Sequence, residues 1–320
     1  MQDRVSVDVV VPCFNGMNFI DGCLESLLTQ TAKICCIIFV DDGSTDESYS
    51  RILQLSTQDS RIKVVKQANQ GLSSARNAGI AASDSTHIAF LDIDDRWLPF
   101  KLERQLEFAS SDSDLLIASN YLNDVGDHFV NGIYNCKHIK LNSSNLLMFR
   151  CVVPGSASSV LIPRKLIDKA GRFSETLRYG EDWDYWIRIS RFAKWKVVNN
   201  QDVIIYQNPV GMQAIRRKSI DPYLDSSLQI INLNRKYLGK LEYLLLRGYI
   251  SFVGAKTTEA NFKSYLELLQ VKFSLNEDGR HKLRNSRVSL ISLLILGLGY
   301  SSYIKLIRVC GNLNRLRSRN

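Results

Sequence analysis

The stretch ICCIIFVDDGSTDES, residues 34–48, carries the signals that decide the fold. Seven consecutive apolar residues, 34–40, are typical of a strand that is buried on both of its faces. Two aspartates follow, and Ser44 and Glu47 then have the spacing of a capping box, with which a helix begins. A buried strand that ends in a polar loop and is followed at once by a helix predicts a parallel sheet covered by helices.

Neighbouring segments of the first hundred residues repeat this strand-and-helix pattern. Strands are predicted at residues 5–11, 62–67 and 87–92, and apolar residues at helical spacing predict helices between and after them. Repeated units of this kind indicate a doubly wound, mostly parallel sheet with right-handed crossovers, flanked by helices. The polar loops PCFN, DDGS and DIDD then fall at the carboxyl ends of the strands, where such sheets bind ligands.

The second half of the chain divides into two parts. LLIASNYL and VPGSASSVLIP predict further strands, but after about residue 208 long side chains at helical spacing replace the strands. We therefore expect one α/β domain at residues 1–210 and a helical C-terminal region at residues 211–320. Residues 281–320 carry +8 of the net charge of +9 and contain no Asp or Glu. The high isoelectric point thus comes from this tail, and the rest of the protein is close to neutral.

The tail also contains a charge-free run of seventeen residues at 288–304. A bilayer span needs roughly 20 residues, whereas the flanking cations suit a helix that lies in the interface of an anionic membrane. A buried helix of the C-terminal region is the alternative. We expect peripheral contact between this tail and a membrane. We expect no nucleic-acid partner, because the body of the protein lacks interleaved basic and aromatic residues.

Cysteine and histidine usage excludes several classes of site. The seven cysteines form no CxxC pair, so zinc ligation is not expected, and the four histidines share no spacing. The first residues enter a strand without a signal-peptide pattern. These features suit a reducing compartment, so we expect a cytoplasmic protein that meets the cytoplasmic face of the membrane.

Acidic residues cluster where the predicted strand at 87–92 leaves the core. In HIAFLDIDDRW, residues 87–97, three carboxylates fall within four positions, at Asp92, Asp94 and Asp95. Like charges this close disfavour one another unless a cation is present. Oxygen ligands of this kind bind Mg²⁺ or Mn²⁺ that is shared with phosphate oxygens. Alternatively, one of the last two aspartates caps the helix that follows, and the residues alone favour neither reading.

Two other acidic pairs occupy comparable places. Asp41 and Asp42 end the strand of the opening stretch, where a carboxylate can accept hydrogen bonds from a nucleobase or a ribose hydroxyl. Glu181 and Asp182 begin a helix in GEDWDYWIR, residues 180–188. The helix dipole favours acids at this position. The sharper interpretation is a general base that takes a proton from an attacking hydroxyl.

Six segments occur in a fixed order along the chain: VDVVVPCFNG, IIFVDDGSTDES, NQGLSSARNAGI, IAFLDIDDRWLPFKLERQ, SSVLIPRKLIDKAGRF and GEDWDYWIR. Together they resemble glycosyltransferase family 2, a large group of inverting enzymes that use nucleotide sugars. The resemblance covers about residues 5–210. It implies the GT-A fold, a Rossmann-like α/β arrangement with a mostly parallel central sheet, and a divalent cofactor, Mg²⁺ or Mn²⁺.

The resemblance also implies roles for individual residues. The nucleotide sugar would be bound by Pro12, Phe14, Asn15, Asp41, Asp42, Arg76, Asp92 and Asp94. Within this set, Phe14 would stack on the base, Asp42 would hold the base, and Arg76 would help to position the diphosphate. The metal would be held by Asp92, Asp94 and Asp95. Asp182 would be the catalytic base, with Glu181 beside it.

The protein expected from these features is a non-processive inverting glycosyltransferase of cell-surface polysaccharide or glycolipid synthesis. Its donor would be a nucleoside-diphosphate sugar, with a UDP-sugar favoured, and its acceptor a saccharide or a lipid-linked molecule. Processive relatives carry QxxRW, whereas Gln213 and Arg216 of QAIRR are not followed by Trp.

Two alternatives are a sugar nucleotidyltransferase and an inactive module that binds nucleotide sugars. The first is disfavoured because PCFNGMN is not a Gly-rich, basic phosphate loop. The second is disfavoured because Asp92, Asp94 and Asp182 are all present.

Overall fold

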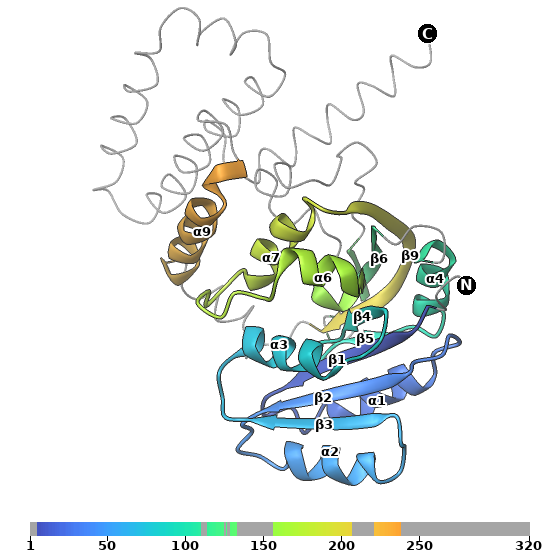
Figure 1. The fold of residues 1–320 in the computed structure, drawn as a ribbon. Helices are drawn as coiled ribbons and strands as arrows, with labels where there is room; N and C mark the ends of the chain where they lie inside the picture. Colours follow the sequence, from blue (N-terminus) through green and yellow to red (C-terminus); the bar gives the residue numbers. More distant parts are fainter. Residues whose placement is uncertain are drawn as a thin grey trace, which may run out of the picture. The chain divides into compact units, whose positions relative to one another are not determined.

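The computed structural model describes residues 5–109, 114–124, 126, 129–132, 156–206 and 221–237. The chain divides into two compact units, residues 1–219 and residues 220–320. The described strands all belong to the first unit and form one sheet with helices packed against it (Figure 1). The second unit contributes the described helices α9 (Asp221–Leu233) and η2 (Arg235–Tyr237).

Parallel strands form the first half of the sheet. In spatial order they are β3 (Ile62–Gln67), β2 (Cys36–Asp42), β1 (Val7–Cys13) and β4 (His87–Phe90). The helices that connect them are α1 (Ile20–Leu28), α2 (Ser48–Ser56) and α3 (Leu72–Ala82). The predicted strand-and-helix units are therefore present, and the loops after β1, β2 and β4 lie at one edge of the sheet.

The second half of the sheet mixes strand directions. After β4 the order continues with β8 (Val160–Pro163), β6 (Leu115–Asp124), β9 (Lys194–Tyr206) and β5 (Arg96–Trp97), and β7 (Phe129–Gly132) pairs with β6. β6 and β9 are parallel, whereas β8, β5 and β7 pair antiparallel with their neighbours. The other described helices of this unit are α4 (Lys101–Ala109), η1 (Ala157–Ser159), α6 (Arg164–Ala170) and α7 (Glu181–Ile189).

Helices pack on both faces of β1, which explains why every residue of that strand is buried. Val9 and Val11 belong to the same apolar cluster as Ile20 of α1. Val10 points to the other face, where α3 passes so closely that a Cβ built at Gly79 would lie 2.2 Å from its Cγ1 atom. The small-residue sequence of α3 thus allows it to lie directly on the sheet.

One local prediction about α2 is wrong. The Ser44–Glu47 capping box would start the helix just after Ser44, but α2 begins at Ser48 and no side-chain hydrogen bond caps it. The Ser44 hydroxyl instead accepts a hydrogen bond from the backbone N–H of Asn15, at 3.0 Å. A contact with the loop after β1 therefore replaces the local capping interaction.

Several predictions about the C-terminal half concern residues outside the described part of the chain. These are the charge-free run at 288–304, the QAIRR segment and most of the helical region at 211–320. Among the helices that are described, none combines the length and the apolar character needed to cross a bilayer.

Candidate active site

The loops after β1 and β2 form one connected polar edge. The side-chain oxygen of Asn15 accepts a hydrogen bond from the backbone N–H of Thr45 at 2.8 Å, and the N–H of Gly16 donates to the Ser48 hydroxyl at 2.9 Å. Asn15 has a φ of 50°, a left-handed conformation that asparagine tolerates better than most residues. The predicted nucleotide-binding residue Asn15 thus fixes the shape of this edge.

Phe14 and Pro12, two of the predicted nucleotide-sugar-binding residues, differ in exposure. Phe14 is 48% exposed, so its ring is accessible at the edge of the sheet. Pro12 is buried in β1, next to Val40 of β2. Between them, burial raises the pKa of the Cys13 thiol to about 11, so this thiol stays protonated near neutral pH and is a poor nucleophile.

Asp41 and Asp42 at the end of β2 have opposite surroundings. Asp42 accepts hydrogen bonds from the side chain of Gln67 at 2.7 Å and from the backbone N–H groups of Gln70 and Gly71 at 2.9 Å each. Asp41 is fully buried, and neither of its carboxylate oxygens has a hydrogen-bond partner among the described residues. The residue predicted to hold the base therefore also organises the loop before α3.

Arg76 of α3 joins two of the predicted acidic segments. Its Nη2 atom lies 2.8 Å from Oδ1 of Asp92, and its Nη1 atom lies 3.0 Å from Oε1 of Glu181. The side chain is only 2% exposed. Burial by itself would lower the pKa of this guanidinium, but the two carboxylates raise it above its usual value. Residues 92 and 181 are thus held on either side of one buried positive charge.

The DIDD segment, residues 92–95, follows β4 after one residue, Leu91. Asp92 and Asp94 are half-buried, whereas Asp95 is buried. Asp95 accepts hydrogen bonds from the Ser158 hydroxyl at 2.6 Å and from the Tyr206 N–H at 3.2 Å. Burial, and then the nearby charges of Asp92 and Asp94, raise the pKa of Asp95 well above its usual range. Neither Asp94 nor Asp95 starts α4, which begins at Lys101.

The carboxylates of the DIDD segment fit a metal that the substrate helps to hold. Within the described residues no group of three or more His, Cys, Asp or Glu side chains is arranged to hold an ion. Mg²⁺ usually takes only one or two carboxylates from a protein and completes its shell with phosphate oxygens and water. Asp92 and Asp94 have the right chemistry for that arrangement. Asp95, the third predicted ligand, already accepts hydrogen bonds on both oxygens.

Glu181 and Asp182 begin α7, as predicted. Gly180 precedes them with a φ of 73°, and the carboxylate of Asp182 accepts a hydrogen bond from the Trp183 N–H at 2.7 Å. Asp182 is half-buried. Burial and the adjacent Asp182 raise the pKa of Glu181, while Arg76 opposes that shift. The helix dipole favours both acids here, and the ion pair to Arg76 connects them to the DIDD segment.

Ser156, Ser158 and the backbone of Tyr206 are site residues that the sequence analysis does not identify. VPGSASSVLIP predicts only a strand, and the contact between Ser158 and Asp95 spans 63 positions in the sequence. The signal available in the sequence was a run of small polar residues just before an apolar strand, which is also common in ordinary turns.

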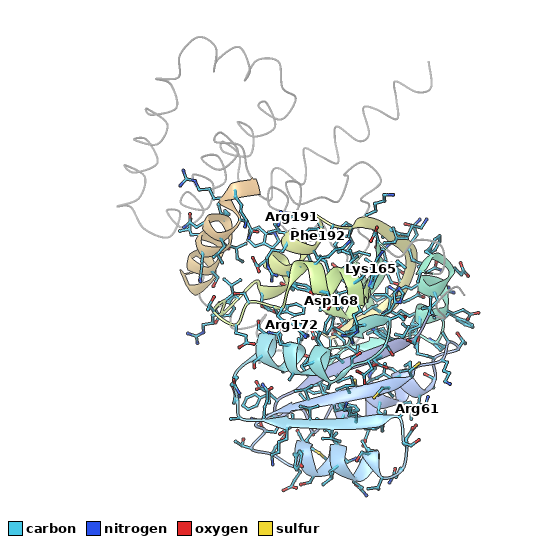
Figure 2. The ribbon with its side chains drawn as sticks, viewed as in Figure 1. Arg61, Lys165, Asp168, Arg172, Arg191 and Phe192 are labelled. Carbon is cyan, nitrogen blue, oxygen red and sulfur yellow. The ribbon has the colours of Figure 1, made fainter. Side chains whose placement is uncertain are left out.

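Figure 2 labels side chains outside this set of site residues: Lys165, Asp168, Arg172, Arg191, Phe192 and Arg61. Arg61 pairs with Asp59, with 2.6 Å between Nη2 and Oδ2, and its side chain is 38% exposed. Because it precedes β3, Arg61 lies at the opposite edge of the sheet from the loops after β1 and β2. It therefore offers a control for substitutions of the buried Arg76.

Known proteins resemble this chain in sequence. The family model described as Glycosyl transferase family 2 matches residues 8–157. A Bacillus subtilis protein described as the uncharacterized glycosyltransferase EpsJ is 31% identical over 240 residues, which are 74% of this chain and 64% of EpsJ, less than two thirds of its length. The putative glycosyltransferase EpsH of the same organism is 31% identical over 241 residues, 73% of this chain and 69% of EpsH.

Solved structures resemble it in fold. The crystal structure of Staphylococcus aureus TarS 1–349 in complex with UDP-GlcNAc matches with a TM-score of 0.61 and 16% identity, covering 91% of this chain and 79% of that one. The likeness confirms the predicted α/β GT-A fold with a mostly parallel sheet flanked by helices. The matched motifs, the two relatives and the shared fold agree, and the chain belongs to glycosyltransferase family 2.

Proposed function

We propose that the protein is a non-processive inverting glycosyltransferase that moves one sugar from a nucleoside-diphosphate sugar to an acceptor hydroxyl. The observation that carries this proposal is the pair of contacts from Arg76 to Asp92 and Glu181. Through them one buried cation joins the acidic loop after β4 to the acidic start of α7. An inverting transferase needs two such carboxylate sets, one for the donor and one for the acceptor.

Asp182 is the proposed general base. It would take the proton of the acceptor hydroxyl as that oxygen attacks the anomeric carbon from the face opposite the leaving group, so that the configuration inverts. Its half-buried position leaves it accessible, whereas Glu181 is engaged by Arg76. Glu181 would therefore hold the start of α7 in place.

On the donor side, Asp92 and Asp94 would hold Mg²⁺ or Mn²⁺, an ion that supplies positive charge to stabilise the departing diphosphate. Phe14 would stack on the base with its exposed ring, and Asp42 would accept a hydrogen bond from the base at the edge it already organises. A UDP-sugar is the favoured donor, because TarS crystals contain UDP and UDP-GlcNAc.

The acceptor and the location follow from the composition of the tail. A charge-free run flanked by cations suits a membrane surface, which supports a saccharide or lipid-linked acceptor at the cytoplasmic face and a role in cell-surface polysaccharide or glycolipid synthesis. Deletion of residues 281–320 should move the protein out of the membrane fraction, and unchanged fractionation would remove this part of the proposal.

A thermal-shift panel of UDP, GDP, ADP and their sugars, with and without Mn²⁺, tests the donor assignment. A ligand that binds only the folded protein stabilises it by about 2.7 kcal/mol at a hundred times its Kd. We expect the largest rise in Tm with a uridine nucleotide and Mn²⁺ together. A panel without any shift would overturn the proposal.

Release of the nucleoside diphosphate in the presence of acceptors tests the chemistry. Asp182→Asn should lower kcat by about 10²–10⁴-fold while keeping the thermal shift, and Asp94→Ala should remove the Mn²⁺-dependent part of that shift. Asp168→Asn, on the outer surface of α6, is the matched control (Figure 2). Binding without transfer by the unaltered protein would favour the inactive module, and full activity of Asp182→Asn would refute the base assignment.

A further inference from the structure

Ser158 contacts both ends of the DIDD segment. Its hydroxyl accepts a hydrogen bond from the Asp92 N–H at 3.0 Å and donates one to Oδ2 of Asp95 at 2.6 Å. Its backbone oxygen accepts from the indole N–H of Trp97 at 2.8 Å. Ser158 is fully buried. The hydroxyl thus uses its one donor position on Asp95 and one of its two acceptor positions on Asp92.

Ser156 reinforces the same contact. Its hydroxyl donates to Oδ2 of Asp95 at 3.2 Å and accepts from the Ser158 N–H at 3.1 Å. Oδ1 of Asp95 accepts from the Tyr206 N–H. We call Ser156, Ser158 and Asp95 the serine–aspartate clamp. It joins the loop after β4 to η1 and to the end of β9, which lie far from it in the sequence.

The clamp determines the backbone that carries Asp92 and Asp94. A hydrogen bond from the Asp95 N–H to the Asp92 carbonyl, at 2.9 Å, already folds the segment into a turn. The Ser158 hydroxyl then fixes the first residue of this turn through its N–H and the last through its carboxylate. Without that hydroxyl, the partly buried Asp92 N–H would lose its acceptor, and the buried Oδ2 atom of Asp95 would lose the shorter of its two hydroxyl contacts. The turn would then rearrange to restore a hydrogen bond.

We propose that Ser158 is a positioning residue that sets the placement of Asp92 and Asp94 for the metal-bound diphosphate of the donor. This inference rests on the proposed function. It assigns Asp95 to the clamp, so that the two preceding aspartates are the carboxylates presented to the ligand. Positioning within about half an ångström is what a preorganised site requires of the residues around it.

Ser158→Ala tests the proposal against Ser159→Ala. Ser159 is equally buried in the same helical turn, but its hydroxyl donates to the backbone of Ser156, at 2.9 Å. We expect Ser158→Ala to raise the Mn²⁺ concentration for the half-maximal thermal shift with a nucleoside diphosphate, and the KM for the donor, about tenfold or more, with the acceptor KM unchanged. Ser159→Ala should lower Tm and leave all three constants at their original values.

Ser156→Ala keeps the test informative if Ser158→Ala does not fold. Ser156 is only half-buried and makes the longer of the two hydroxyl contacts to Asp95, so we expect shifts of the same sign and smaller size.

Two results would overturn this proposal alone. One is a set of unaltered constants in Ser158→Ala, or in Ser156→Ala if Ser158→Ala does not fold. The other is an equal rise of the constants in Ser159→Ala. If the unaltered protein bound no nucleoside diphosphate with Mn²⁺, the proposed function would fail and this inference with it.

Discussion

The carboxylate of Asp42 accepts a hydrogen bond from the backbone N–H of Gly71 at 2.9 Å and so ties the end of β2 to the start of α3. Gly71 has a φ of 90°, and no side chain caps the helix that follows it. The contact brings Arg76, one turn further along α3, to its place beside Asp92. The placement of Arg76 on α3 thus depends on the carboxylate of Asp42, at the end of β2.

Asp42→Ala should therefore affect stability as well as binding. The change removes the acceptor of two partly buried backbone N–H groups and leaves the side chain of Gln67 with only its longer contact to the Ser74 hydroxyl. Each hydrogen bond of this kind contributes about 0.5–1.5 kcal/mol. We expect a lower urea midpoint and weaker binding of the nucleotide. Asp46→Ala, in the same loop but more exposed, should cost less stability. An unchanged urea midpoint for Asp42→Ala would show that other contacts hold the loop.

Arg76→Met should destabilise the protein strongly. Removal of one partner from a buried ion pair costs about 3–5 kcal/mol, and here two carboxylates would be left near each other without a cation. Arg61→Met, which breaks the exposed pair with Asp59, should change stability by less than about 1 kcal/mol. Urea denaturation of both variants measures the difference, and equal midpoints would contradict it.

Gly79→Ala should destabilise the contact between α3 and β1. The added methyl group would lie 2.2 Å from Cγ1 of Val10, and overpacking of this kind costs about 1–3 kcal/mol or more. Val10→Ala in the same chain should recover part of the loss, because it removes the colliding atoms. A double-mutant cycle by urea denaturation measures the recovery. If the two changes in the free energy of unfolding were strictly additive, α3 would be relieving the collision by moving away from Val10.

Lys101→Met should stabilise the protein near neutral pH. The ammonium nitrogen is buried, lies 3.5 Å from the centre of the Trp97 ring, and has no hydrogen-bond partner among the described residues. Burial lowers the pKa of Lys101 well below its usual 10.5, and Asp202 opposes the shift only in part. A buried donor without a hydrogen-bond partner costs about 1–3 kcal/mol, and an apolar side chain of similar length avoids that cost.

The lowered pKa of Lys101 determines how the stability of the protein changes with pH. Between the lowered pKa of Lys101 in the folded protein and 10.5, the unfolded chain binds a proton that the folded chain does not, so the stability of the unaltered protein rises with pH over that range. The advantage of Lys101→Met should therefore shrink between neutral pH and pH 10.5. Lys63→Met, on an exposed lysine, should show no such trend. A constant difference across this range would mean that Lys101 is charged in the folded protein.

The sequence predicts the parts of the fold that depend on local patterns. Most of the apolar run at 34–40 lies in β2, the strand predicted at 5–11 overlaps β1, and the acidic segments at 92–95 and 181–182 lie where a strand end and a helix start were expected. These features depend on burial and periodicity within about ten residues, which a single sequence displays directly.

Other features depend on partners far away in the chain. Ser44 has the local pattern of a helix cap but contacts Asn15, and Asp95 has the pattern of a metal ligand but contacts Ser158. Asp41 and Asp42 are adjacent acids, and only the register of β2 decides which of them is buried without a partner. Tertiary packing determines these partners and which carboxylate is buried, and it gives no periodic signal in the sequence.

The short strand β5 has a consequence for how the protein is made. It follows β4 by a few residues, yet it pairs with β9, and Asp95 receives a hydrogen bond from Tyr206, 111 positions later. During synthesis, a nascent chain can assemble β1 to β4 long before the segment that secures its acidic turn has left the ribosome. A nascent chain in which β1 to β4 have assembled therefore has an acidic turn that lacks its hydrogen bond from Tyr206 until residue 206 has left the ribosome.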